Sequence, residues 1–212
     1  MYQLNMRSHE SSGFLITFCG LDGCGKTTII RKILNELEQD YPLVLTKQPT
    51  NAVRNSEIFR AFMDSPKHDE YDYRSLSLLA ASDRLQHVHQ VIMPELKSGK
   101  IVLSDRYFYS CLANLHARGY KEDRWIHEIA QSVVAPDIAF FLDVPVDTAI
   151  SRVRSRPIEK DRFIDIDLQY RLREEYIKIC EKNGGYLLST IVSQEETFRE
   201  ALHIIKQRVG EK

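Results

Sequence analysis

The strongest constraint in this sequence is an eight-residue stretch that begins at Gly20 and directly follows a short apolar run, residues 14–19. The stretch is GLDGCGKT, and it fits the pattern G-x-x-x-x-G-K-[ST] at every fixed position. Glycines in such a loop let successive backbone amides converge on phosphate oxygens, while the lysine neutralises the outer phosphates and the hydroxyl can bind Mg²⁺. A plain glycine turn with a solvated lysine is the alternative, but it leaves this combination of residues to chance. The stretch therefore predicts a nucleotide phosphate site that uses Lys26 and Thr27.

Short apolar runs along the chain predict a sheet of buried strands. Four runs are nearly continuous and a fifth is weaker; they cover residues 14–19, 43–46, 101–104, 137–142 and 186–189. Such runs are typical of a parallel sheet that is covered on both faces. Segments with apolar residues at helical spacing separate the runs, and this alternation indicates a doubly wound α/β fold. Pro94 is expected to disturb the last turns of the helix that precedes it.

The composition limits the kind of partner and the number of domains. With 29 Lys+Arg against 30 Asp+Glu and a net charge of −1, the chain has no basic footprint for nucleic acid or a membrane surface. No apolar run approaches the roughly 20 residues that cross a bilayer, and because the sequence starts with a polar stretch we expect no secretory signal. Four widely spaced cysteines indicate neither a disulfide framework nor a zinc site. We expect a cytoplasmic protein in which residues 1–12, where nothing can bury, form a flexible extension to a single domain, residues 13–212.

A second polar cluster, Asp105-Arg106-Tyr107, comes where the third apolar run ends. Ligands of a doubly wound sheet collect beyond the carboxyl ends of the strands. Asp105 and Arg106 are therefore expected to point toward the glycine-rich loop, although an ion pair at the strand end is the alternative interpretation. The chain contains no N-K-x-D sequence of the kind that reads guanine, which argues against a GTPase.

These motifs together resemble the thymidylate kinase family of P-loop nucleoside monophosphate kinases, over residues 13–209. The segments that carry the resemblance are FLITFCGLDGCGKTT, TKQPT, LLAASDRLQHV, IVLSDRY, APDIAFFLDVPVD and RSRPIEKDRF. The resemblance implies a three-layer P-loop NTPase fold with a five-stranded parallel sheet, helices on both faces and a short lid at about residues 155–165. It also implies a homodimer that uses ATP and Mg²⁺ to phosphorylate a nucleoside monophosphate, with conversion of dTMP to dTDP as the default.

The resemblance further implies a role for each matching residue. The residues expected around the ATP phosphates are Gly20, Gly23, Cys24, Gly25, Lys26, Thr27 and Thr28. Those expected to bind Mg²⁺ are Thr27 and, through water, Asp105. Those expected to bind the acceptor nucleotide are Asp22 near its sugar, Arg84 at its base, Arg106 on its phosphate, Lys47 and Tyr107. The residues expected to act in catalysis are Lys26, Asp22, Arg106 and two arginines of the lid, Arg156 and Arg162.

Phosphoryl transfer makes sense of this pattern, because the protein contributes mainly positioning and positive charge around the reacting phosphates. Two anions must be brought together, so cations are needed from several directions: Lys26 from the loop, Arg106 from the sheet, and the arginines of the lid. Cys24 stands where some family members carry a basic residue, so the resemblance implies the type whose arginine is in the lid. The alternatives are a solvated charged loop in place of the lid and a surface ion pair for Arg84.

Four departures from the family pattern concern the acceptor site. The segment after the second strand is KQPT, residues 47–50, without the family's carboxylate and glycine. Ala80 stands where the family has a ring that stacks on thymine, four residues before Arg84. Residues 114–115 are Asn-Leu in place of Tyr-Gln, and Phe59 stands in place of an arginine.

These departures leave the phosphate chemistry intact and the base pocket altered. Loss of a stacking ring costs about 1–3 kcal/mol of base binding unless another ring replaces it. The rings that could do so are Phe59, Phe62, Tyr73 and Tyr109. Two alternatives to dTMP phosphorylation therefore stay open: the same transfer to dUMP, UMP, CMP or a non-nucleotide acceptor, and a nucleotide-binding regulator without kinase activity.

Overall fold

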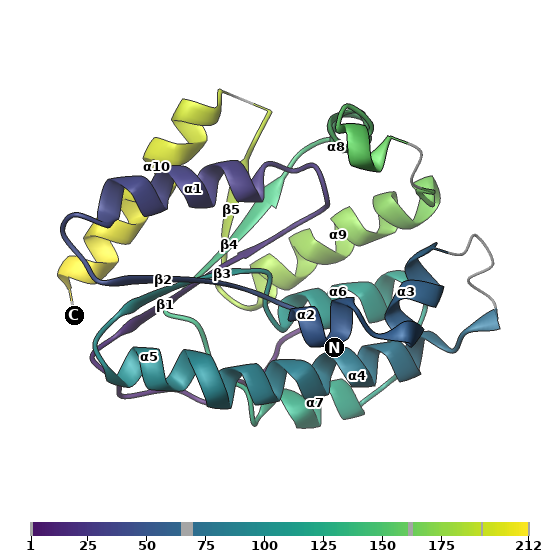
Figure 1. Cartoon of the computed structure of the whole chain (residues 1–212), viewed down its shortest axis with the longest axis horizontal. Coiled ribbons are helices and arrows are strands. Elements are labelled where there is room, and N and C mark those ends of the chain that lie inside the picture. Colours follow the sequence, from purple (N-terminus) through teal and green to yellow (C-terminus); the bar gives the residue numbers. More distant parts are fainter. Residues whose placement is uncertain (1, 65–69, 161–162, 192, 212) are drawn as a thin grey trace.

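A five-stranded sheet forms the centre of the chain, with all neighbouring strands parallel and the order β2-β3-β1-β4-β5 (Figure 1). This is a computed structural model, and it describes residues 2–64, 70–160, 163–191 and 193–211. The strands are β1 (Phe14–Cys19), β2 (Leu43–Lys47), β3 (Ile101–Asp105), β4 (Ile138–Asp143) and β5 (Tyr186–Ser189). All five strands predicted from the sequence are confirmed, each with its ends within one residue of the expected bounds.

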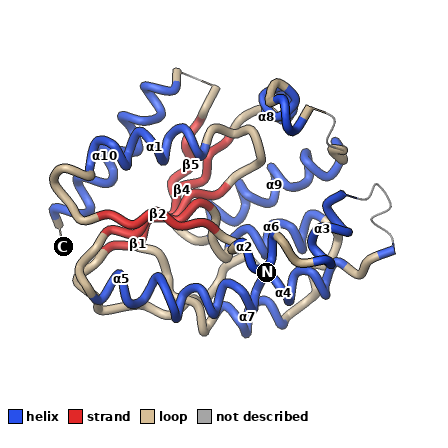
Figure 2. The backbone as a smooth tube through the Cα atoms, viewed as in Figure 1, coloured by secondary structure: helices blue, strands red, loops and turns tan. Residues whose placement is uncertain are grey.

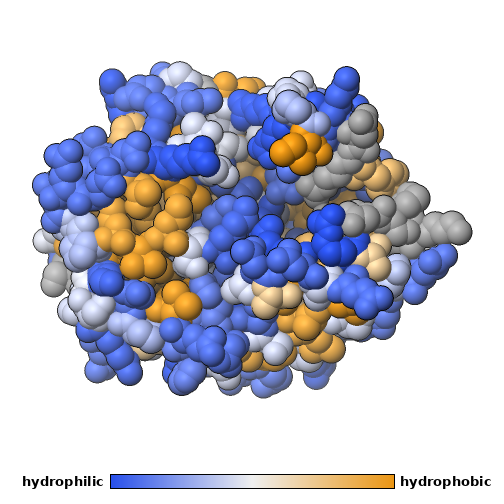
Figure 3. Space-filling model, viewed as in Figure 1, coloured by the Kyte–Doolittle hydropathy of each residue, from blue (hydrophilic) through white to orange (hydrophobic). Residues whose placement is uncertain are grey.

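The position of each strand explains its sequence. Every residue of β1 and β3 is buried, because each of these strands lies between two others and under helices on both faces. The edge strands β2 and β5 keep exposed side chains such as Leu45 and Leu187, and an apolar patch is visible beside β2 in Figure 3. Parallel pairing also brings the carboxyl ends together: Phe18 pairs with Asp105, which pairs with Lys47 on its other side.

Helices cover both faces of the sheet, which confirms the three-layer α/β fold (Figure 2). One face carries α1 (Lys26–Leu37) and α10 (Gln194–Gly210), which pack against each other. The other face carries α4 (Tyr73–His87), α5 (Met93–Lys97), α6 (Tyr109–Ala117), α7 (Trp125–Ala130) and α9 (Ile166–Lys182). Shorter helices follow the carboxyl ends of β2 and β4: α2 (Asn51–Arg54), α3 (Glu57–Asp64), α8 (Val146–Arg154) and a 3₁₀ turn (Pro157–Glu159). No helix within the described ranges is long and apolar enough to span a membrane.

Pro94 disturbs its helix as predicted, but the chain does not break there. A π-helical turn, Val88–Ile92, joins α4 to α5, and Pro94 occupies the first turn of α5. The amide of Met93 donates to the carbonyl of Val88, five residues earlier. A proline has no amide to donate and clashes with the carbonyl four residues before it, and a wider turn relieves both problems.

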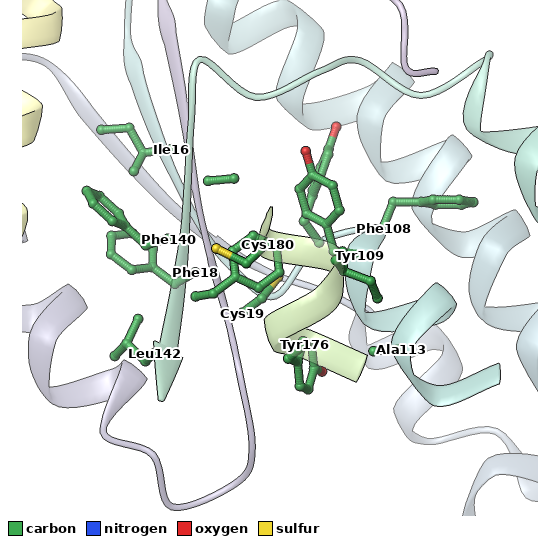
Figure 4. Packing of buried hydrophobic residues seen from close by; sticks show 14 of the residues in the cluster. Ile16, Phe18, Cys19, Phe108, Tyr109, Ala113, Phe140, Leu142, Tyr176 and Cys180 are labelled. Carbon is green, nitrogen blue, oxygen red and sulfur yellow. The ribbon is translucent and has the colours of Figure 1, made fainter. Parts of the chain in front are cut away.

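Large aromatic side chains pack on both faces of the sheet. Phe18 of β1 and Phe140 of β4 stack with their ring centroids 5.3 Å apart (Figure 4). On the opposite face of the sheet, Phe141 packs against Tyr109 of α6 and Tyr176 of α9. The core thus fixes α6 and α9 relative to the carboxyl ends of β1 and β4, where the polar residues of the site lie.

The expectation that nothing in residues 1–12 can bury is wrong for part of that segment. Leu4 is buried in the core, and its amide donates to Asn183 Oδ1 at 2.9 Å. Arg7 forms a parallel bridge with Val134, and His9 Nε2 lies 3.0 Å from Asp137 Oδ2. Leu4 anchors the segment together with Tyr2 and Met6, which pack against the core, and hydrogen bonds to the body of the protein satisfy part of its polar backbone.

Candidate active site

The glycine-rich loop joins β1 to α1 in a shape that only glycines permit. Gly20 and Gly23 have φ values of 135° and 83°. A Cβ on Gly23 would lie 2.2 Å from the carbonyl oxygen of Ala149, and one on Gly20 would lie 2.4 Å from that of Leu142. The loop therefore packs its backbone directly on the residues around the end of β4, and it leads straight into the first turn of α1, which contains no acidic residue. This is the strand–loop–helix geometry that favours an anion at a helix N-terminus.

Lys26 folds back over the loop that precedes it. Its side chain is buried, and Nζ donates to the carbonyl oxygens of Leu21 at 2.7 Å and Gly20 at 3.1 Å. Nζ also lies 3.5 Å from the sulfur of Cys24, which is itself buried, in keeping with a small spacer. Thr27 is exposed at the mouth of the loop. The ammonium group of Lys26 is thus held by two carbonyl oxygens of the loop.

The loop forms one end of a cavity of about 870 Å³ that extends between α3, α4, α6, α9 and the segment after α8. Positive side chains dominate its lining. They are Lys26, Lys47, Arg54, Arg60, Arg84, Arg106, Arg118 and Arg156, whereas the acidic side chains of the described lining are Asp22, Asp105 and Glu159. Such a wall suits an anionic ligand, because low-dielectric surroundings strengthen its attraction to the cations.

Asp105, at the carboxyl end of β3, has a carboxylate oxygen that no group in the described part of the chain bonds. Its Oδ2 lies 3.2 Å from Lys47 Nζ, while its buried Oδ1 has no hydrogen-bond partner among the described residues. Carboxylate and hydroxyl oxygens are the protein ligands that Mg²⁺ prefers, usually one or two of them together with phosphate and water. Asp105 and Thr27 fit that donor set, and both line the cavity. The described residues contain no group of three or more His, Cys, Asp or Glu placed to bind a metal, so a small donor set is the one available.

Arg106 crosses from the end of β3 to the loop. Its backbone has φ of 71°, and its Nη2 lies 2.5 Å from Asp22 Oδ1. Nη1 donates to the oxygen of Gly20 at 3.2 Å and to the hydroxyl of Tyr176 at 3.1 Å. Burial opposes the charge, but Asp22, Tyr176 and Asp105 raise the pKa of Arg106 well above its usual value. The arginine is therefore permanently charged, and its ion pair is with the loop and not with its neighbour in the sequence.

Arg84 is buried and lines the cavity, so the alternative of a surface ion pair is wrong. Its Nη1 donates to the carbonyl of Ala80 at 2.9 Å, while Nε has no partner among the described residues. Neighbouring Asp83 instead accepts hydrogen bonds from the amide and hydroxyl of Thr50, which fixes the segment after β2 against α4.

Sequence reasoning missed a buried polar chain beneath this segment. The imidazole of His87 lies 2.6 Å from Thr46 Oγ1 and 3.0 Å from Gln48 Nε2. Burial lowers the pKa of His87, with Asp83 opposing that effect. These contacts tie Thr46 and Gln48, the two residues on either side of Lys47, to α4. Their only sequence signal is the pair of polar residues around Lys47, which by itself does not identify a partner.

The lid and aromatic predictions have mixed outcomes. Arg156 lines the cavity and pairs with Glu159 Oε2 at 3.1 Å, while Arg162 lies outside the described residues.

Tyr107 is fully buried and donates to the carbonyl of Val134 at 2.7 Å, so the expected contact with substrate is wrong: the ring packs in the core. Of the rings considered for stacking, Tyr109 packs on Phe141 away from the cavity, whereas the three others line it, namely Phe59, Phe62 and Tyr73.

Comparisons with known proteins agree with this geometry. The family model described as thymidylate kinase matches residues 18–201. A protein of Thermococcus kodakarensis named probable thymidylate kinase is 35% identical over 199 residues, which cover 91% of this chain and 97% of that protein. A thymidylate kinase of Staphylococcus epidermidis is 32% identical over 204 residues, with 90% and 98% covered. The crystal structure of thymidylate kinase from Ehrlichia chaffeensis superposes with a TM-score of 0.70 at 25% identity, over 91% of this chain and 98% of that one.

Proposed function

The chain belongs to the thymidylate kinase family, and we propose that it transfers the γ-phosphoryl group of ATP to dTMP, releasing ADP and dTDP. The observation that carries the proposal is the cation-lined cavity that joins the glycine-rich loop to Arg106 and Arg84. It runs from the loop at one end, past Arg106, to Arg84, so it connects the expected site of the ATP phosphates with space for an acceptor. No feature of the cavity favours a regulator without activity, since the loop, Asp105 and Arg106 are all in place.

On this proposal the ATP phosphates lie on the amides of the loop, from Gly20 to Thr28, with Lys26 on the outer phosphates. Mg²⁺ would be held by Thr27 and, through water, by Asp105, and it would supply further positive charge beside the phosphates. The loop also positions Asp22, whose carboxylate is already paired with Arg106 at the entrance to the acceptor half of the cavity.

The acceptor phosphate would be bound by the Arg106 guanidinium, because a planar arginine suits two phosphate oxygens better than lysine does. At neutral pH a phosphate monoester has largely lost its second proton, so its oxygen attacks the γ-phosphorus without a general base. The bond from that phosphorus to the β-phosphate oxygen breaks, and its electron pair leaves with ADP. Lys26, Arg106 and Arg156 surround the oxygens on which negative charge spreads during this step.

The remaining parts of the proposal follow from the family. Residues 13–212 would act as a single catalytic domain whose lid, at about residues 155–165, brings Arg156 and Arg162 over the transferring group. Closure of such a lid excludes water, which would otherwise hydrolyse ATP. A homodimer in the cytoplasm remains a prediction.

The proposal is tested by coupled measurement of ADP release with dTMP, dUMP, UMP and CMP as acceptors, in the presence of Mg²⁺. We expect dTMP to stimulate ADP release most strongly, and Lys26→Ala to remove the stimulation. Strong stimulation by another acceptor without any by dTMP would show that the acceptor is misassigned. Normal ATP binding without stimulation by any acceptor would instead favour a regulatory nucleotide-binding protein.

A further inference from the structure

The far end of the cavity is lined by two helices, α4 and α6, which contact each other. α4 contributes Ser77, Ala80 and Arg84, which recur at helical spacing and so lie on one face. α6 contributes Asn114, and Arg118 follows at its C-cap. The small side chain of Ala80 is only partly buried, so this wall offers a base no flat surface of its own.

Arg118 places a flat, charged group in this part of the cavity. Its guanidinium carbon lies 4.0 Å from the ring centroid of Tyr73 and 5.6 Å from that of Phe62. The two centroids are only 5.4 Å apart, much less than the combined distances from the guanidinium to each ring. The rings therefore lie toward the same side of the guanidinium, and they do not sandwich it. One side of Arg118 is backed by aromatic rings, and these rings leave its opposite side uncovered.

Asn114 fixes the orientation of that guanidinium. Arg118 Nη1 donates to Asn114 Oδ1 at 2.8 Å and to the Asn114 carbonyl at 3.3 Å. The amide nitrogen of Asn114 in turn donates to the carbonyl of Ser110 at 2.9 Å, which ties the pair to the first turn of α6. The guanidinium of Arg118 is thus fixed by an aromatic ring against its flat side and by hydrogen bonds at its edge. Because the side chain is already ordered, it loses little further conformational entropy when a ligand stacks on it.

We propose that Arg118 supplies the stacking surface for the acceptor base, in place of an aromatic ring at position 80. This inference rests on the proposed function, because it assumes that a nucleoside monophosphate occupies the acceptor half of the cavity. A guanidinium plane stacks on a base as it does on a ring. The changes at positions 80 and 114 then act together: Ala80 leaves room for the base, and Asn114 holds Arg118 against it.

The same wall favours a base with carbonyl groups on its edge. Arg84 Nε is buried and lacks a partner among the described residues, and an arginine can only donate. The hydroxyl of Ser77, also buried and without a partner among the described residues, lies on the same face of α4. A pyrimidine with two carbonyl groups, such as thymine or uracil, would satisfy these donors, whereas the amino group of cytosine would face a cation.

The test compares steady-state kinetics of Arg118→Ala and Arg118→Lys with those of the unaltered protein. We expect both variants to raise the KM for dTMP roughly 10- to 100-fold, the range for loss of one stacking partner, with little change in the KM for ATP. Lysine should not rescue, because it keeps the charge and loses the plane. Adding Ala80→Phe to Arg118→Ala should restore much of the lost affinity for dTMP, since it provides a flat ring on the α4 side of the cavity.

Arg74→Ala is the matched control. Arg74 lies over the ring of Tyr120 at 4.2 Å and is paired with Asp123, so it forms a similar arginine–tyrosine contact outside the cavity. Its loss should leave the KM for dTMP unchanged. Unchanged kinetics in Arg118→Ala would overturn the proposal, and full activity in Arg118→Lys would overturn its stacking component. A raised KM without recovery in the double variant would also count against stacking.

Failure of the proposed function is distinguishable from failure of this inference. If the unaltered protein uses UMP or dUMP but not dTMP, the acceptor assignment fails, while the same variants measured with the active acceptor still test Arg118. If the unaltered protein binds none of the nucleoside monophosphates by calorimetry, both proposals are wrong.

Discussion

The variant Tyr176→Phe removes one hydroxyl group that bonds Arg106. It tests whether Arg106 needs this hydrogen bond to bind the phosphate of the acceptor nucleotide. Tyr176 is buried on α9, and its hydroxyl donates to Ser110 Oγ at 3.1 Å while accepting from Arg106 Nη1 at the same distance. Within the described ranges it is one of three groups that bond the guanidinium, with Asp22 and Gly20. Phenylalanine keeps the ring and its packing on Phe141, so the variant removes the hydrogen bonds and little else.

The expected loss can be worked out from these contacts. A hydrogen bond to a charged group contributes about 1.5–3 kcal/mol to stability. Arg106 retains its two other partners, so we expect the lower end of that range, about 1.5 kcal/mol. Expressed in acceptor binding, this corresponds to a roughly tenfold rise in the KM for dTMP. The KM for ATP should change little, because Tyr176 contacts Arg106 and does not contact Lys26.

Burial raises the pKa of Tyr176 to about 12, so the phenol is neutral throughout the working range of the enzyme. The difference between Tyr176→Phe and the unaltered protein should therefore be the same at pH 6.5 and pH 9. Tyr170→Phe is the control, because Tyr170 lies on the same helix, is exposed, and bonds Asp147 Oδ1 at 3.2 Å outside the cavity. If Tyr176→Phe leaves the KM for dTMP unchanged, or changes the two KM values equally, Tyr176 does not position Arg106.

Three further perturbations have expected outcomes. Lys26→Ala should lower kcat about 100- to 1000-fold, because the ammonium acts mainly on charge that develops in the transition state; an unchanged kcat in a steady-state assay would refute that role. Gly23→Ala should lower the thermal midpoint and weaken ATP binding, since its Cβ would lie 2.2 Å from the Ala149 oxygen at a φ of 83°; calorimetry that shows normal stability and binding would mean that the loop can shift. Burial lowers the pKa values of His87 and His116, so the unfolded chain binds more protons as pH falls below about 6.5. Urea unfolding should then give a smaller unfolding free energy at pH 5.5 than at 7.5, and His116→Gln should reduce that difference; a difference unaffected by the substitution would assign the acid sensitivity to other groups.

The sheet could be predicted from the sequence because its signals are local. A strand buried on both faces must be apolar along most of its length, and β1, β3 and β4 satisfy that condition apart from Thr17 and the polar residues at the carboxyl ends of β3 and β4. The edge strand β5 is half-exposed, which is why its signal was weaker. The burial of Leu4 could not be predicted, because it depends on contacts with residues far along the chain, such as Asn183.

The candidate site could be predicted only where its functional residues are adjacent in the sequence and form a motif. The loop and the Asp105-Arg106 pair are such cases, and the structure brings them to one cavity. Tyr107 shows the limit: next to Arg106 in sequence, it points into the core because successive residues after a strand need not share a direction. Tyr176 and His87 show the reverse case. They are far from the motifs in the sequence and contact the residues of the site only in the folded chain, so the sequence does not identify them.

The net charge of −1 limits which large partners the chain can attract, but it says little about the charge of an individual binding site. Many carboxylates are paired on outer helices, as in the contacts of Glu195 with Lys32 and of Glu36 with Lys206. Those pairs are exposed and strongly screened, so they contribute little to the field in the cavity. Inside, the cations of the described lining outnumber the acids, and Asp22 and Asp105 are each held by a cation. The chain as a whole can therefore lack the positive net charge that attracts a long polyanion. It can still gather enough positive charge in the cavity to bind two small anions side by side.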